Sequence, residues 1–238
     1  MLLLFALAGA DTLTTEPYCR VGRLLHGRRW NVASLDLPCH GADRRAGEPA
    51  ERIGWELDAW AARIATGENI VADFRQRVSD VVTHLIKEKL ADPGRIAAAG
   101  ISRGGFMAFH AAAGDPRIRA VAAFAPVTDL LALSEFAGQA ADPLVRGLAL
   151  ANIAAALADR AIWISIGNHD ERVNSQKAAA FALAAADASA ARGLDANITL
   201  HLLPTPGHTT QPEWHDDAAG WLQKETVEEH ATNPTSHR

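Results

Sequence analysis

Three residues far apart in the sequence have the side chains of a nucleophile, an acid and a base: Ser102, Asp170 and His208. A serine hydroxyl is a weak nucleophile at neutral pH. It becomes reactive when an imidazole accepts its proton and a carboxylate orients that imidazole. Such a set of residues can take an acyl group from a carbonyl compound and pass it to water. The three side chains must first meet in space, so the elements that carry them matter.

Ser102 is the central residue of a G-x-S-x-G pattern that runs from Gly100 to Gly104. An apolar run at 96–99 precedes the pattern and reads as a strand, and a helix-compatible run at 103–113 follows it. Five residues of this kind recur by chance, and a glycine-rich loop would show them too. The order of strand, sharp turn and helix favours a nucleophile elbow, in which the serine backbone is strained and the glycines leave room for close packing.

Asp170 and His208 each follow an apolar run that reads as a strand, at 161–166 and at 198–203. In an open parallel sheet, functional residues gather on the loops at the carboxyl ends of the strands. We therefore expect the acid and the base to lie at the same rim of the sheet as Ser102.

Neighbouring residues offer alternatives for the acid and the base. Glu171 is an alternative acid, and His169 is an alternative base, although it lies on the loop of the proposed acid. His208 could instead cap the helix that follows it. Three further histidines lie within predicted elements and read as packed or solvated side chains: His110, His201 and His215.

Apolar runs and amphipathic segments alternate along the rest of the chain. We predict strands at 2–7, 30–35, 96–99, 120–125, 161–166 and 198–203. We predict helices at 18–25, 70–90, 103–113, 175–191 and 212–225. The polar stretch 38–67 and the segment 126–159 read as irregular. Such alternation predicts the α/β class, with a mostly parallel sheet that has helices on both faces.

The composition indicates one globular domain. The chain has 238 residues, of which 48% are hydrophobic, and a formal net charge of −5. This predicts a single domain over 1–227 with a polar C-terminal tail at 228–238. The negative charge and the lack of a basic run argue against nucleic acid or an anionic membrane surface as a partner.

Several compositional features indicate a cytoplasmic protein without a cofactor. Cys19 and Cys39 form neither a zinc motif nor a disulfide framework, and reduced thiols suit the cytoplasm. No metal-ligand spacing and no dinucleotide or phosphate-loop glycine pattern occurs. Residues 1–10 could pass for a short signal peptide, but they lack a positively charged start. We favour a buried strand there.

Several ordered motifs resemble the α/β-hydrolase superfamily, in the branch of dienelactone hydrolases and prolyl-oligopeptidase-like serine hydrolases. The resemblance spans about Leu3 to Leu222 and rests on Asp36 to Gly41, Gly100 to Gly105, Ala125 to Asp129, Gly167 with Asp170, Arg172 and Val173, and Gly207 with His208. It implies that Ser102 is the nucleophile, Asp170 the acid and His208 the base. It also implies a small lid insert at about 126–159.

The chain departs from this family in two places. The usual His-Gly pair after the third strand is replaced by residues 7–10, Leu-Ala-Gly-Ala. Since an oxyanion hole uses backbone N–H groups, we expect the amide of Arg103 and one from Leu7 or Ala8 to form it. The family's first two strands also have no counterpart here. The exposed sheet edge that follows favours a covering partner, such as a second copy in a homo-oligomer, or lower stability.

These observations predict a serine esterase that cleaves small-molecule esters of small or medium acyl groups through an acyl-enzyme. A small peptidase or amidase would use the same chemistry, and an inactive hydrolase-like binding protein is the third alternative. Trp55 and Trp60 are either pocket wall or packing. The same choice, between an apolar acyl pocket and packing of the lid, holds for Leu130, Leu131, Leu133, Phe136, Leu144, Val145 and Leu148.

Overall fold

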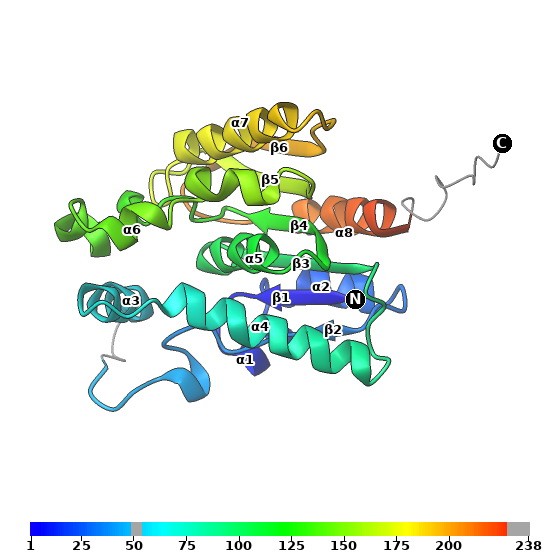
Figure 1. Ribbon diagram of the computed structural model, residues 1–238, viewed down its shortest axis with the longest axis horizontal. Coiled ribbons are helices and arrows are strands. Elements are labelled where there is room, and N and C mark those ends of the chain that lie inside the picture. Colours follow the sequence, from blue (N-terminus) through cyan, green and yellow to red (C-terminus); the bar gives the residue numbers. More distant parts are fainter. Residues whose placement is uncertain (49–53, 228–238) are drawn as a thin grey trace.

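In a computed structural model that describes residues 1–48 and 54–227, six strands form one sheet in the order β2-β1-β3-β4-β5-β6. All five pairings are parallel, as predicted for the α/β class (Figure 1). The strands are β1 (Leu2–Phe5), β2 (Val32–Ala33), β3 (Ile96–Ile101), β4 (Ile118–Phe124), β5 (Ala161–His169) and β6 (Ile198–Pro206).

Helices of the described residues lie in the connections between strands, and α8 follows the last strand. They are α1 (Gly9–Thr14), α2 (Arg20–His26), α3 (Trp55–Ala65), α4 (Ile70–Lys87), α5 (Arg103–Gly114), α6 (Pro143–Gly147), α7 (Ser175–Ala191) and α8 (Pro212–Val227). Short 3₁₀ helices add η1 (Gly41–Asp43), η2 (Leu130–Ala132), η3 (Ser134–Gln139) and η4 (Leu150–Leu157). None of these helices is long and apolar enough to span a membrane.

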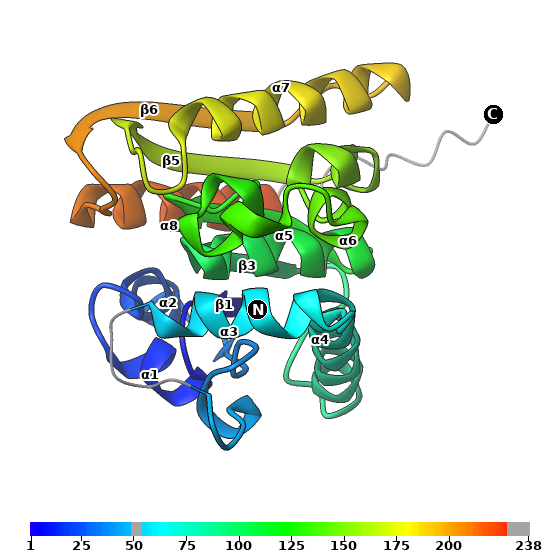
Figure 2. The same ribbon diagram turned by 90° about the vertical axis from the view of Figure 1, so that its left-hand side faces the viewer.

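The sheet has a hydrophobic core on each face, because successive strand side chains point to opposite sides. In β1, Leu3 and Phe5 enter the larger core with residues of α3, α4, α5 and α7. Leu2 and Leu4 enter the smaller core with residues of α2 and α8. Figure 2 shows α2 and α8 on one side of the sheet and α4 on the other. Burial on both faces explains why these strands read as continuous apolar runs.

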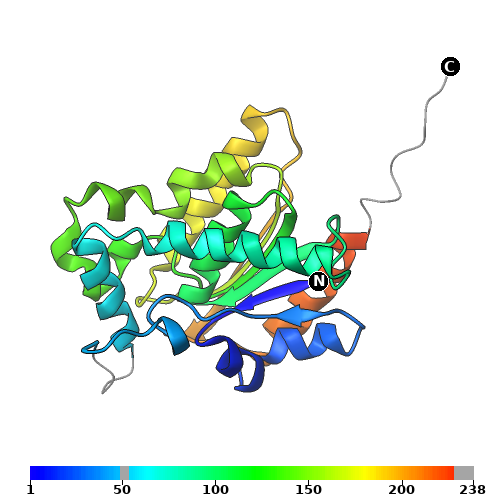
Figure 3. The same ribbon diagram turned by 60° about the horizontal axis from the view of Figure 1, so that its bottom comes forward.

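The parallel arrangement brings the predicted functional loops to one end of the sheet. Phe5 of β1 pairs with Gly100 of β3, so the end of β1 lies beside the serine turn. The turn after β3 and the loops after β5 and β6 all leave the sheet at its carboxyl end. The helices α3 and α6 lie beyond that end (Figures 1 and 3).

The stretch expected to be irregular contains a helix, α3. Leu57, Trp60 and Ile64 are all buried and recur at helical spacing. Trp60 is fully buried, and its Nε1 donates to the carbonyl oxygen of Pro38 at 2.7 Å. Of the two readings for Trp60, packing is therefore the correct one.

A buried arginine fixes α3 to the preceding loop. Arg63 is 6% exposed and donates to the carboxylates of Glu48 at 2.7 Å and Asp43 at 2.8 Å. It also donates to the Asp43 carbonyl oxygen at 2.7 Å. These bonds hold the loop around residues 41–48 against the helix whose first turn faces the carboxyl end of the sheet.

The sheet ends at β2 on one side and at β6 on the other. Only Val32 and Ala33 of the predicted strand at 30–35 pair with β1, which makes β2 a very short edge strand. On this side the sheet edge lies at β2, whose two residues are half-buried, and a partner that covers this edge stays a prediction. The predicted tail at 228–238 lies outside the described residues.

Candidate active site

The turn after β3 strains the backbone of Ser102, as predicted. Its φ is 54° and its ψ is −119°, a conformation that favours glycine. A Cβ on Gly100 would overlap the backbone of Gly104, and a Cβ on Gly104 would overlap the carbonyl group of Phe5. Both glycines of the pattern are thus required by close packing of the turn, the helix and β1.

Hydrogen bonds to the neighbouring strand hold this strained turn in place. The amide of Ser102 donates to the carbonyl oxygen of Phe124 at 2.9 Å, and the amide of Val127 donates to the Ser102 carbonyl oxygen at 3.1 Å. One strand further, the amide of Ala125 donates to the Ser165 carbonyl oxygen at 2.7 Å. The serine backbone is therefore anchored to β4, and β4 in turn to β5.

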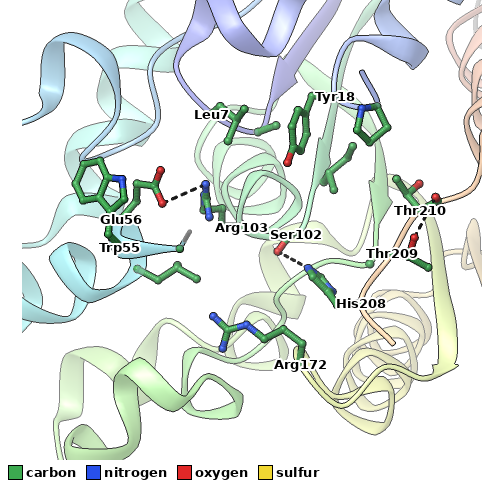
Figure 4. Close-up of a pocket in the computed structure, with 16 residues that line it drawn as sticks. Leu7, Tyr18, Trp55, Glu56, Ser102, Arg103, Arg172, His208, Thr209 and Thr210 are labelled. Atoms are coloured by element: carbon green, nitrogen blue, oxygen red, sulfur yellow. Dashed lines mark hydrogen bonds and ion pairs between the residues drawn. The ribbon is translucent and has the colours of Figure 1, made fainter. Parts of the chain in front are cut away.

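The structure brings Ser102, His208 and Asp170 together at this rim. His208 Nε2 lies 3.0 Å from Ser102 Oγ (Figure 4), and His208 Nδ1 lies 2.8 Å from Asp170 Oδ2. Each contact is of hydrogen-bond length. The carboxylate accepts the hydrogen on Nδ1, which leaves Nε2 free to accept the serine proton.

Asp170 is 2% exposed and has partners for both carboxylate oxygens. Oδ2 faces His208, while Oδ1 accepts from the amides of Arg172 at 3.0 Å and Val173 at 3.2 Å. Burial alone would raise the pKa of this carboxyl, but the hydrogen bonds from His208 and the two amides outweigh it and hold the pKa below its ordinary value. The carboxylate is therefore charged at neutral pH.

The alternative acid and base are not part of this arrangement. Glu171 and His169 are both exposed, and the serine hydroxyl and the imidazole of His208 bond to neither of them among the described residues.

The three remaining histidine candidates lie in packed surroundings, as expected. His110 Nε2 lies 2.9 Å from the Leu148 carbonyl oxygen, His201 packs against the ring of Trp163, and His215 stacks on a phenylalanine of β4. Burial lowers the pKa of His110 and of His215 to about 4. Both rings are therefore neutral at pH 7.

The expected oxyanion donors differ in availability. Arg103 is the first residue of α5, where an amide has no acceptor within the helix. The amide of Leu7 donates instead to Thr12 Oγ1 at 2.9 Å, because α1 begins directly after β1 and folds this hydroxyl back. Ala8 is not among the residues that line the cavity beside Ser102. In this structure the Leu7 amide is thus engaged by the Thr12 hydroxyl, and a second oxyanion donor from Leu7 or Ala8 stays a prediction.

A cavity of about 760 Å³ opens beside Ser102 and His208 (Figure 4). This volume is typical of small-molecule sites. Residues from the start of the chain, from α3, from the serine turn and from the His208 loop form its wall: Ala6, Leu7, Pro17, Tyr18, Gly54, Trp55, Glu56, Leu57, Ile101, Ser102, Arg103, Ala125, Arg172, His208, Thr209 and Thr210. Trp55 is therefore pocket wall.

The apolar residues of segment 126–159 do not line this cavity. Leu130, Phe136 and Val145 are fully buried in the larger core, and the other members of the set pack against or within it. Their burial in that core removes apolar surface from water. Of the two alternatives for these residues, packing is therefore the one that the structure shows.

Two polar residues of the cavity, Glu56 and Tyr18, were not identified as site residues from the sequence. Glu56 comes from α3, which was read as irregular, and Tyr18 comes from the segment before α2. The signal that could have placed Glu56 on a helix was the helical spacing of apolar residues after Trp55. Arg172 was identified through a motif, and it carries a guanidinium into the cavity wall.

Within the described residues, no group of three or more His, Cys, Asp or Glu side chains is placed to hold a metal ion.

Comparisons with known proteins bear on the family and the fold of this chain. The sequence model of the prolyl oligopeptidase family matches residues 54–228, more than half of the chain. No curated protein sequence gave a match. The protein TT1662 from Thermus thermophilus superposes with a TM-score of 0.66 at 19% identity, covering 95% of this chain and 89% of that one.

Two further structures come from named enzymes. The esterase Pf2001 of Pyrococcus furiosus has a TM-score of 0.63 at 17% identity, covering 94% of this chain and 83% of that one. The acylaminoacyl peptidase of Pyrococcus horikoshii has a TM-score of 0.53 at 15% identity, covering 70% of this chain and 29% of that one. The structural likeness shows a shared α/β-hydrolase fold. The match to the family model shows in addition which family the sequence falls in: the chain is a hydrolase that belongs to the prolyl oligopeptidase family.

Proposed function

We propose that this protein is a serine esterase that hydrolyses carboxylic esters of small or medium acyl groups through an acyl-enzyme. Ser102 is the nucleophile, His208 the base and Asp170 the acid in this proposal. The observation that carries it is the continuous contact from Ser102 Oγ to His208 Nε2 at 3.0 Å and from His208 Nδ1 to Asp170 Oδ2 at 2.8 Å.

The proposed reaction begins when His208 Nε2 accepts the proton of the Ser102 hydroxyl. The serine oxygen attacks the ester carbonyl carbon, and the oxyanion that forms accepts a hydrogen bond from the Arg103 amide. The buried Asp170 carboxylate stabilises the imidazolium. His208 then gives its proton to the departing alcohol, and a water molecule repeats the sequence on the acyl-enzyme, releasing the acid and free Ser102.

The size and wall of the cavity support a small substrate. A volume of about 760 Å³ suits a molecule with a short or medium acyl chain.

The two cysteines are unpaired and buried, which supports the proposed cytoplasmic location.

A peptidase or amidase of the same mechanism is the second candidate. The family match and the likeness to an acylaminoacyl peptidase favour it. The superposition with the esterase Pf2001 has the higher TM-score, 0.63 against 0.53. We therefore rank ester hydrolysis first.

Covalent labelling and a substrate panel test the proposal. A fluorophosphonate probe should modify Ser102 in the wild type and leave Ser102→Ala unmodified, and the variant should lose hydrolysis of p-nitrophenyl acetate and butyrate. Failure to label Ser102 would favour a binding protein without catalysis. Faster turnover of aminoacyl p-nitroanilides than of the esters would favour the peptidase.

A further inference from the structure

Two arginines line the cavity, but their side chains are paired very differently. Arg172 donates to both carboxylate oxygens of Glu135, at 2.9 and 2.6 Å. Its charge is therefore matched by a bidentate partner. Arg103 has one carboxylate neighbour, Glu56, whose Oε2 lies 3.5 Å from Nη2.

The contact between Arg103 and Glu56 is an ion pair without a hydrogen bond. Glu56 Oε2 and Arg103 Nε are both buried, and neither has a hydrogen-bond partner among the described residues. Arg103 is only 15% exposed and Glu56 only 14%. Nε is closed off from the cavity, but the Nη groups are the exposed end of the side chain and their carboxylate neighbour is 3.5 Å away, so they keep the capacity to bind a ligand.

The cavity wall holds cationic side chains although the whole protein is acidic. Two arginines and one glutamate line it, while the chain carries a formal net charge of −5. Since the Arg172 charge is matched by Glu135, Arg103 is the cation whose pairing is weakest. Burial lowers the pKa of Arg103, and Glu56 partly opposes that shift. An anionic group would replace the hydrogen bonds to water that the Arg103 guanidinium has lost on burial.

The position of Arg103 indicates which part of a substrate it would meet. The departing alcohol takes its proton from His208 and therefore leaves on the His208 side. Figure 4 shows the Arg103 guanidinium on the other side of Ser102, toward Glu56. A group bound there belongs to the acyl part of the substrate.

We propose that the Arg103 side chain binds a carboxylate on the acyl part of the substrate, so that the enzyme prefers half-esters of dicarboxylic acids to esters of neutral acids. This inference rests on the proposed function. The guanidinium offers a planar set of N–H donors that matches a carboxylate. Glu56 then acts as a positioning residue that holds Arg103 at the cavity wall.

A matched pair of substrates tests this preference. Monoethyl succinate and ethyl butyrate have acyl chains of the same length and differ in the terminal carboxylate. We expect kcat/KM, measured by pH-stat at neutral pH, to be about 10- to 100-fold higher for monoethyl succinate, the range of a hydrogen bond to a charged group. An equal or lower value for monoethyl succinate would overturn the proposal.

Variants of the two arginines separate this role from general charge. Arg103→Met should reduce the ratio of the two kcat/KM values to about one, while Arg103→Lys should keep part of it. Arg172→Met removes the other arginine of the cavity and should keep the preference. A ratio that survives in Arg103→Met, or that is lost only in Arg172→Met, would refute the assignment to Arg103.

A binding measurement keeps this test independent of catalysis. Ser102→Ala should bind monoethyl succinate more tightly than ethyl butyrate by calorimetry, and Ser102→Ala with Arg103→Met should lose the difference. Loss of turnover in Ser102→Ala tests the nucleophile, whereas the order of the two affinities tests the carboxylate site. Equal affinities would refute the carboxylate site even if the esterase activity is found.

Discussion

Replacing Asp170 by asparagine moves the imidazole hydrogen of His208 from Nδ1 to Nε2, while the size and shape of the side chain at position 170 hardly change. The present carboxylate accepts two amides at Oδ1 and His208 Nδ1 at Oδ2. In Asp170→Asn, the side-chain carbonyl would keep the two amides as donors. The NH₂ group would then face His208 Nδ1 and donate to it. The imidazole would carry its hydrogen on Nε2, where it cannot accept the proton of Ser102.

The size of the effect follows from the contact. With the two charges about 4 Å apart and an effective dielectric constant of about 20, the carboxylate stabilises an imidazolium by about 4 kcal/mol. About 1.4 kcal/mol corresponds to a factor of ten in rate, so losing this stabilisation alone lowers kcat about 1000-fold. The wrong tautomer increases the loss to about 10,000-fold.

The assay is steady-state hydrolysis of p-nitrophenyl acetate, with Glu171→Gln as the matched control. Glu171 is the neighbouring carboxyl in the sequence and is exposed. The Glu171→Gln variant should therefore keep kcat within about a factor of two of the wild-type value. Circular dichroism and the urea midpoint should show that Asp170→Asn is folded. A kcat above a tenth of the wild-type value in Asp170→Asn, or a large loss in Glu171→Gln, would refute the role of the acid.

Three further predictions concern stability. His110 has a pKa of about 4 in the folded protein, against about 6.5 when unfolded, so the unfolded chain takes up the proton first as the pH falls. Between pH 7 and pH 5 this should remove about 2 kcal/mol of stability, and urea unfolding of His110→Gln should show a correspondingly weaker pH dependence. Arg63→Met leaves two carboxylates without their buried partner and should cost about 3 kcal/mol. Arg45→Met removes an exposed arginine from its ion pair with Glu68 and should have a much smaller effect in the same assay. Gly104→Ala should prevent soluble folding because its Cβ would overlap backbone, whereas Gly220→Ala, with open space around it on α8, should raise the unfolding free energy by about 1 kcal/mol.

Each of these has a clear contrary result. An unchanged pH dependence in His110→Gln would mean that another group titrates in this range. Equal losses of unfolding free energy in Arg63→Met and Arg45→Met would mean that burial does not determine how much an ion pair contributes to stability. A folded, active Gly104→Ala would show that the turn can move away from β1.

The buried strands and the longest helices could be predicted from the sequence because their patterns are dictated by burial. The prediction of a helix at 175–191 matches α7, and the helix predicted at 70–90 differs from α4 only at its end. The turn at Ser102 was predictable because the steric need for two glycines leaves a fixed spacing.

The wall of the cavity could not be predicted because it depends on tertiary packing. The first turn of α3 faces the serine only because Arg63 and Trp60 fix the helix to a loop that precedes it in the chain. Similarly, leucines of segment 126–159 have the same hydrophobicity whether they line a pocket or fill a core. The engagement of the Leu7 amide by Thr12 is a contact between a backbone and a side-chain group that no spacing encodes.

At Ser102 the requirements of stability and of activity conflict, because the strained backbone favours glycine while the proposed reaction needs the serine hydroxyl. A φ of 54° costs a serine about 1–3 kcal/mol that a glycine would not lose. Laboratory evolution for heat resistance alone, with no selection for turnover, should therefore accumulate glycine at this position. Persistence of serine under such a regime would mean that the hydroxyl itself supports the fold.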